Sequence, residues 1–448
     1  MKKNTVYTIT VILFIAAIGL IVFKYNREEK KNSTAFYEIQ PRTGAAAQTP
    51  EWQTISKRAV VLQNAVKYNP ADNKSLLALA GVFIQEARVT GNYMYYDMAA
   101  MKYINDVLKT DTANFDALTL KSLIYLSQHH FADGLATAQK AKSINPYNAF
   151  VYGIMIDGNV EMGYYDSAVN NAEKMISIRP DIRSYSRISY LREIHGDYAG
   201  AIEAMKLAVQ AGIPGEETTE WSRVQLGHLY ENTGDLKNAE NNYNTALQSR
   251  PSYAYAVAGM ARIAMGTKDY KKAIALYQQA DALVNDYAFK EELVDAYKLS
   301  GENEKANTIA TTVIEGMSKD AQSGNSNESI GHYADRELAY AYLKVNNYDK
   351  ALEHALAEYN RRPDNIDVNE TVAWVYYCKG DYTKALPYLK LALKTGSKNP
   401  TLLCRAGLIY SKAGEKTVAK MLLQQALKDN ANIAANLKTD SINTLQNL

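Results

Sequence analysis

The chain has 448 residues, of which 47% are hydrophobic and 22% charged, so most of it is expected to fold. Its 24 glycines and 10 prolines are few for this length, which favours helices over turn-rich structure. Fifty basic residues against 48 acidic ones leave a formal charge of +2, which argues against nucleic acid as a partner. Two cysteines exclude a disulfide framework and any multi-cysteine metal site.

The N-terminus contains an uncharged apolar run at residues 6–23, preceded by Lys2 and Lys3 and followed by Lys24 and Arg27. Such a run is just long enough to cross about 30 Å of hydrocarbon as a helix. We therefore expect residues 1–23 to form a signal anchor with one transmembrane helix; a cleaved signal peptide is the alternative. The short basic start favours export, so the rest of the chain is predicted to lie on the periplasmic or extracytoplasmic side, although more positive charge follows the run.

Residues 24–48 are first charged and then small and polar, which predicts a flexible tether. Thr49, Pro50 and Glu51 then read as a helix N-cap, a proline at the first helical position and an acid in the first turn. The folded part is expected to begin there with a single leading helix.

A small residue recurs in similar surroundings, mostly every 33 or 34 positions, through the rest of the chain. The recurring residues are Ala100, Gly134, Ala168, Ala201, Ala239, Ala273, Ala306, Ala351, Ala385 and Ala419. Between them, a glycine followed by aspartate, as in Gly196-Asp197, predicts a left-handed helix end and the cap of the next helix. With almost no loop, the two helices must pack antiparallel, and the small residue allows them to cross closely.

This pattern resembles the tetratricopeptide repeat, with its best match at Leu226, Gly227, Tyr230, Gly234, Ala239, Tyr243, Ala246 and Pro251. The resemblance extends over about residues 53–433. It implies an all-α fold, a right-handed superhelix of about ten helix-turn-helix repeats. The repeats are placed at 73–114, 115–148, 149–181, 182–215, 220–253, 254–286, 287–320, 332–365, 366–399 and 400–433.

Three stretches depart from the regular repeat. The first repeat carries extra residues around 88–96, residues 216–219 are an extra turn before Trp221, and residues 321–331 are small and polar. We expect residues 49–320 to hold the leading helix and seven repeats, residues 321–331 to form a flexible linker, and residues 332–433 to hold three further repeats at a different angle. Residues 434–448 are expected to supply a polar cap or tail.

No sequence pattern of a catalytic or metal site was found. The six histidines lack the spacing of a zinc protease, no G-x-S-x-G occurs, and neither cysteine has a nucleophile signature. We therefore predict no enzyme activity, no cofactor and no metal. In the repeat frame Cys378 and Cys404 are offset by about eight residues, or about 12 Å along a helix, so free thiols are expected.

The resemblance implies that partners bind the concave surface, which in this family is lined mainly by positions 2, 5, 6, 9, 12 and 13 of each first helix. Those positions give a partner-binding groove of Arg187, Tyr190, Glu193, Trp221, Gln225, His228, Tyr255, Arg262, Arg336, Tyr340, Glu370, Trp374 and Tyr377. Position 9 carries no asparagine in any repeat, so a clamp for the terminal carboxylate of a chaperone tail is not expected.

These observations favour a membrane-tethered scaffold in a bacterial cell envelope that binds a protein or an extended peptide. One alternative is binding of a glycan or the cell wall by Trp221, Tyr255, Tyr340 and Trp374. Another is an accessory subunit of an envelope enzyme complex.

Overall fold

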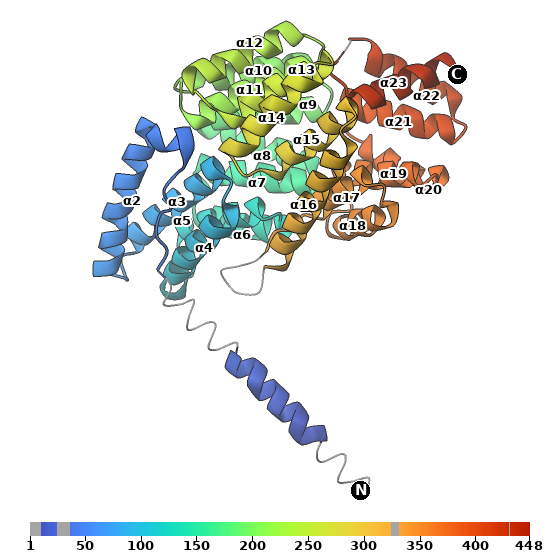
Figure 1. Ribbon diagram of the computed structural model, residues 1–448. Coiled ribbons are helices and arrows are strands. Elements are labelled where there is room, and N and C mark those ends of the chain that lie inside the picture. The colour runs from blue at the N-terminus through green and yellow to red at the C-terminus, as the bar shows by residue number, and fades with distance from the viewer. Residues whose placement is uncertain (1–9, 25–35, 324–330, 430) are drawn as a thin grey trace, which may run out of the picture.

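The computed structural model describes residues 10–24, 36–323, 331–429 and 431–448, and these ranges contain helices and no strands. Residues 10–24 form a helix in which every residue is exposed (Figure 1). Within the described ranges, no helix combines the length and the apolar character needed to cross a membrane. The predicted span also takes in residues 6–9, which lie outside the described residues.

The rest of the chain is a succession of antiparallel helix pairs, which confirms the predicted all-α class. A short 3-10 helix, η1 (Gly44–Gln48), and a single helix, α2 (Pro50–Tyr68), precede the first pair. The pairs are α3 (Asn73–Thr90) with α4 (Tyr93–Thr110), α5 (Phe115–Ser127) with α6 (Phe131–Ile144), α7 (Ala149–Met162) with α8 (Tyr165–Ile178), α9 (Ile182–Ile194) with α10 (Tyr198–Ala211), α11 (Glu217–Asn232) with α12 (Leu236–Ser249), α13 (Ala254–Gly266) with α14 (Tyr270–Leu283), α15 (Tyr287–Ser300) with α16 (Asn303–Gln322), α17 (Asp335–Lys344) with α18 (Tyr348–Arg361), α19 (Ile366–Cys378) with α20 (Tyr382–Ala392), and α21 (Pro400–Lys412) with α22 (Lys416–Leu427). The last helix, α23 (Ala435–Gln446), packs on α21 and α22.

The turn inside each pair follows the local chemistry that the sequence predicts. Gly196 and Gly234 adopt positive φ angles of 76° and 77°, which end the first helix in the left-handed conformation. His129, Lys268 and Asn346 adopt the same conformation in three turns where glycine is missing. Asparagine and histidine are among the non-glycine residues that tolerate this conformation best, so Lys268 is the least favourable residue of the three.

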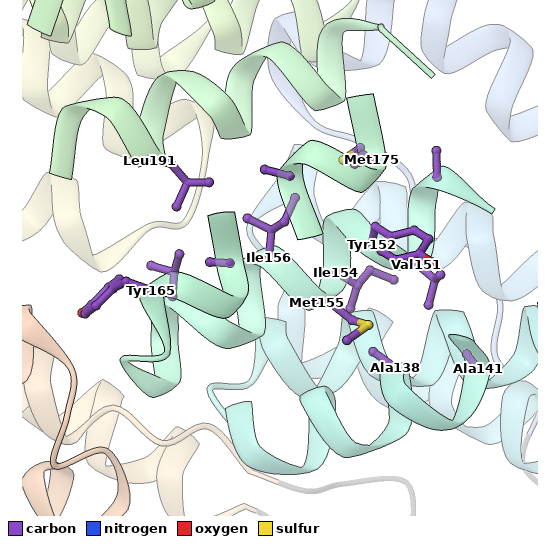
Figure 2. Packing of buried hydrophobic residues seen from close by; sticks show 14 of the residues in the cluster. Ala138, Ala141, Val151, Tyr152, Ile154, Met155, Ile156, Tyr165, Met175 and Leu191 are labelled. Atoms are coloured by element: carbon purple, nitrogen blue, oxygen red, sulfur yellow. The ribbon is translucent and has the colours of Figure 1, made fainter. Parts of the chain in front are cut away.

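The recurring small residues lie where the two helices of a pair cross. The alanines of this column, such as Ala168 and Ala239, are completely buried. Figure 2 shows the core around the third pair, where Ala138 of α6 and Met155 of α7 pack together, and Tyr165 and Met175 of α8 extend the cluster toward α9. Alanine permits this close approach because it has no side chain beyond Cβ.

The segment predicted as a flexible tether is packed from residue 36 onward, which differs from the expectation. The backbone NH groups of Glu38 and Gln40 donate to the hydroxyls of Tyr95 and Tyr96, each at 3.1 Å. Arg42, which is buried, forms a double hydrogen bond with Glu86 on α3, at 2.9 Å and 2.6 Å. The tyrosines come from the extra residues of the first repeat, so this insertion holds the N-terminal segment on the array.

The helix pairs coil so that a second superhelical turn rests directly on the first (Figure 1). At several places, the turn between the two helices of one pair contacts the loop that precedes the helix pair six repeats later in the chain. The backbone NH groups of the later loops donate to the earlier turns in three places: Asn285 to Thr90 O at 3.4 Å, Tyr333 to Gln128 O at 3.1 Å, and Asn432 to Glu231 O at 3.0 Å.

The polar interruption at residues 321–331 does not change this six-repeat offset between contacting segments. The six-repeat offset is the same for the contact before it, at Asn285, and for those after it, at Tyr333 and Asn432. The contacts of the last three repeats with the first turn place them in the same coil, while their different angle to the preceding repeats stays a prediction. Residues 324–330 of the interruption lie outside the described residues.

Candidate functional site

The inner face of the first superhelical turn surrounds a cavity of about 2210 Å³, which we call the lumen. Its wall is formed by the first helix of successive pairs, from α3 to α17. The loops that precede α11, α13 and α15 complete the wall, because the contacts between turns bring them against the first repeat. The lumen is thus the concave surface of the repeats, with these loops along part of its rim.

Six of the predicted groove residues lie together in the lumen wall. They are Arg187, Tyr190, Glu193, Trp221, Gln225 and Tyr255. Tyr190 is 40% exposed and lines the lumen. Desolvation by the surrounding protein raises its pKa well above the usual range.

His228 and Arg262, also predicted for the groove, take part instead in a half-buried network behind the lumen. The Arg262 guanidinium forms an ion pair with Glu231 at 3.2 Å and donates to the Tyr243 hydroxyl at 3.2 Å. His228 contacts the same guanidinium, and its pKa is lowered well below its ordinary value by burial and by that charge. These side chains are engaged with each other, so they stabilise the packing of α11, α12 and α13.

The remaining predicted residues gather in the second superhelical turn around Arg405, which the sequence analysis missed. The Arg405 guanidinium lies 5.2 Å from the Tyr340 ring and 5.0 Å from the Trp374 ring, and it pairs with Glu370 at 2.9 Å. Tyr377 stacks on Trp374 with ring centroids 4.8 Å apart, and Arg336 lies 5.6 Å from the Tyr340 ring.

This arrangement divides the four aromatic residues considered for glycan binding. Trp221 and Tyr255 face the lumen, whereas Tyr340 and Trp374 contact an arginine of the chain itself. The four rings therefore do not form one continuous stacking surface.

Arginines in the lumen wall are held by carboxylates and aromatic rings. Arg88 pairs with Glu217 at 3.2 Å and lies 5.7 Å from the Trp221 ring. Arg187 donates to both oxygens of Asp157, at 2.9 Å and 2.6 Å. Charge-assisted pairs of this geometry orient the side chains that face the cavity.

The lumen wall is strongly acidic although the whole chain is nearly neutral. Eleven lining residues are aspartate or glutamate and four are arginine, which gives the lining a formal charge of −7. The pKa of Glu193 is raised to about 7 by burial and, to a smaller extent, by nearby Asp367, while a hydrogen bond from Asn232 opposes the shift. Burial likewise raises the pKa of Glu291 to about 7 and that of Asp97 to about 6.

Several of these acids lie at the repeat positions that the sequence analysis assigned to the concave surface, although they were not among the predicted groove residues. Asp157, Glu291 and Glu337 lie at positions 9, 5 and 6 of their repeats, so the frame itself could have identified them. Glu216 and Asp286 lie in loops between repeats, and no repeat position predicts them. They reach the lumen only because contacts between superhelical turns bring these loops to its rim.

Outside the lumen, the two cysteines are both free thiols. Cys404 is buried and Cys378 half-buried. Burial raises the pKa of Cys378 to about 11, which makes it a weak nucleophile at neutral pH.

A family model described as tetratricopeptide repeat matches residues 232–288, and a second model with the same description matches residues 336–400. No curated protein sequence matches the chain.

Three solved structures illustrate the structural likeness. A tetratricopeptide repeat protein from Parabacteroides merdae is 14% identical and has a TM-score of 0.43, covering 56% of this chain and 93% of its own. Human IFIT1 in a dimer with m7Gppp-AAAA is 14% identical with a TM-score of 0.49, covering 78% of each chain. A thermophilic TPR protein from Thermus thermophilus is 19% identical with a TM-score of 0.37, covering 43% of this chain and 97% of its own.

The two matched stretches fall on helix pairs in different halves of the array, and the same pairing runs from α3 to α22. The resemblance predicted from the sequence is thereby confirmed, and the chain contains tetratricopeptide repeats.

Proposed function

We propose that this chain is a non-enzymatic, membrane-tethered scaffold that holds another protein inside the lumen. Tetratricopeptide repeats are generally scaffolds for protein–protein interaction. The observation that carries the proposal is the lumen itself, whose wall combines Tyr190, Trp221 and Tyr255 with charged side chains from successive helices. Aromatic and arginine residues in a concave surface are the usual anchors of protein binding.

The tether and its side of the membrane are part of the same proposal. The apolar run at residues 6–23 and the exposed helix at residues 10–24 support an N-terminal anchor. The short basic start supports an extracytoplasmic position for the repeats, in a bacterial cell envelope. Protease treatment of intact cells and of spheroplasts tests this position. The repeats should be cleaved in spheroplasts, where the protease reaches the outer side of the inner membrane, and should stay whole in intact cells, where it does not.

Site-specific cross-linking tests the binding site. A photoreactive amino acid in place of Tyr190 should capture a partner protein from native membranes in defined stoichiometry. The same substitution at Tyr147, which is 80% exposed outside the lumen, should capture none of it. Equal capture at both positions, or capture at Tyr147 alone, would place the binding surface elsewhere.

A further inference from the structure

We propose that the lumen takes up an extended, lysine- or arginine-rich segment of the partner protein. This inference rests on the proposed function and adds the chemistry of the bound segment. It is based on the distribution of charge, on the hydrogen-bond and ion-pair partners of individual carboxylates, and on the contacts that the wall makes with the chain's own guanidinium groups.

The acidic charge of the lumen is not a property of the chain as a whole. The chain carries +2, whereas the lining carries −7. Arg362, which is not part of the lining, offsets one of these charges by pairing with Glu161. Three of the four lining arginines are already paired with lining acids: Arg88 with Glu217, Arg187 with Asp157, and Arg250 with Glu51. An acidic excess remains after all these pairs.

The excess belongs to carboxylates whose basic partners within the described residues are distant or lacking. Glu193 forms no ion pair there, and its one side-chain hydrogen bond comes from Asn232 at 3.2 Å. In the same ranges, Oε1 of Glu291 is out of reach of solvent and accepts no hydrogen bond, and the nearby Lys344 charge offsets only part of the effect of its burial. Glu337 is already stabilised, because His129 and Arg336 hold its pKa below the usual range against the effect of burial. Leaving carboxylate oxygens buried without partners is costly, so a cation entering the lumen stabilises them.

The chain's own arginines show how the wall binds such a cation. The Arg88 guanidinium lies against both the Glu217 carboxylate and the Trp221 ring, and Arg183 lies 4.7 Å from the Phe150 ring. In the same wall, the Tyr255 hydroxyl donates to Asp286 at 3.4 Å, and Tyr190 lies one helical turn before Glu193 on α9. A ring beside a carboxylate is a favourable site for lysine or arginine, because the cation is attracted by both.

The size of the lumen favours a chain segment over a small molecule. Its volume of about 2210 Å³ exceeds the range of roughly 300–1,000 Å³ that is typical of small-ligand pockets. The cavity follows the first helices of successive repeats from α3 to α17, so a chain segment laid along it can contact many of them at once. The same negative wall repels nucleic acid, whose backbone needs basic contacts.

Peptide binding to the full-length protein in detergent tests the charge of the occupant. The probes are a fluorescein-labelled peptide of Lys-Gly-Ser repeats and a matched peptide with glutamate in place of lysine. Fluorescence anisotropy should show saturable binding of the basic peptide and none of the acidic one. Since the interaction is electrostatic, binding should weaken as salt rises from about 50 to 200 mM. Equal binding of the two peptides, or no binding of the basic one, would overturn the inference.

Paired variants locate the binding to the lumen. At pH 8, where both carboxyls are mostly ionised, Glu193→Gln with Glu291→Gln removes about two lumen charges, and we expect about a tenfold loss of affinity or more, since close charge pairs contribute at least that factor. Glu203→Gln with Glu240→Gln removes two charges from exposed positions on α10 and α12, and affinity should stay within about twofold. Equal effects from both pairs would show that the peptide binds outside the lumen. Circular dichroism of each variant verifies that the helices are intact.

The experiments distinguish a failure of the charge inference from a failure of the proposed scaffold function. If a partner still cross-links at position 190 but the basic peptide does not bind, the scaffold function stands and the charge inference fails. If neither the partner nor any peptide is held at position 190, the proposed function fails as well.

Discussion

At the scale of single residues, the buried alanines decide how closely the two helices of a repeat approach. Ala239 is completely buried beside Tyr243 and Val224 between α11 and α12. A Cβ on neighbouring Gly227 would lie 2.4 Å from the Tyr243 ring, so this crossing has no spare room. We expect Ala239→Leu to destabilise the protein by about 1–3 kcal/mol through overpacking.

Urea unfolding measures this effect, with Lys237→Ala as the control. Lys237 is exposed near the start of the same helix, so its replacement should change the free energy of unfolding by no more than about 0.5 kcal/mol. Similar losses from the two substitutions would mean that the repeat frame is shifted.

Glu193 leads to a prediction about pH. Its folded pKa is raised to about 7, from an ordinary value of 4.5, by burial and by Asp367, against the Asn232 hydrogen bond. A raised folded pKa contributes stability that is present below pH 4.5 and lost as pH rises through 7. Glu193→Gln should therefore stabilise the protein at pH 8 by on the order of 1 kcal/mol, and by less at pH 5.

The difference between the unfolding free energies of variant and parent, followed from pH 5 to 8, measures this dependence. A difference that is constant over this range would show that the carboxyl of Glu193 titrates as an ordinary exposed group.

At the scale of elements, the segment before α2 belongs to the folded array. Arg42 is its main anchor, since the partner carboxylate of Glu86 is completely buried. Removing residues 1–31 leaves these contacts in place, so we expect a folded helical protein with unchanged stability. Removing residues 1–48 deletes Arg42 and leaves the Glu86 carboxylate unpaired, which should cost about 3–5 kcal/mol.

Circular dichroism and urea unfolding of the two truncated proteins, beside the full chain, distinguish these outcomes. Aggregation of the shorter truncation with loss of helicity would contradict the independence of the array from the N-terminal helix. Equal stability of both truncations would contradict the role of Arg42.

At the scale of the whole molecule, stability depends on contacts between superhelical turns as well as between neighbouring repeats. Arg362 is buried at this contact, where it pairs with Glu161 of the first turn and with Glu358, and lies 4.4 Å from the Phe131 ring. Nearby, Asn365 donates to Val160 O at 3.2 Å, and Ile366 NH donates to the Tyr165 hydroxyl at 2.9 Å. We expect Arg362→Ala to destabilise the protein by about 3 kcal/mol, because it removes a buried guanidinium that pairs with Glu161 and Glu358 and packs on Phe131, although Glu358 keeps its pair with Arg361.

Hydrogen exchange shows where this loss acts. Exchange should accelerate at the turn between α7 and α8 and at the start of α19, two segments about 200 residues apart in the chain that contact each other only through the coil. The control is Lys384→Ala, which removes a largely exposed pair with Asp381 and should have almost no effect. Acceleration confined to α19 would mean that the two turns are not coupled.

The sequence by itself was sufficient to identify the helix pairs, because the signals that define them lie within one repeat. A glycine in the left-handed conformation, an aspartate cap and a small residue at the crossing act over a few residues, and they recur too regularly to be missed. Six of the predicted groove residues also face the lumen, since a position on the first helix fixes which way a side chain points. The groove as a binding site stays a prediction.

Only the tertiary structure decided that the groove is acidic and has loops along part of its rim. Each repeat adds a small rotation to the next, and no single motif records the sum that brings Glu161 against Arg362 after six repeats. For the same reason the sequence could not show that the interruption at residues 321–331 leaves the six-repeat offset intact, or that Arg405 fills the space between Tyr340 and Trp374. Contacts inside a repeat are local and repeated, so a pattern reveals them; contacts between turns depend on the accumulated geometry of the whole coil.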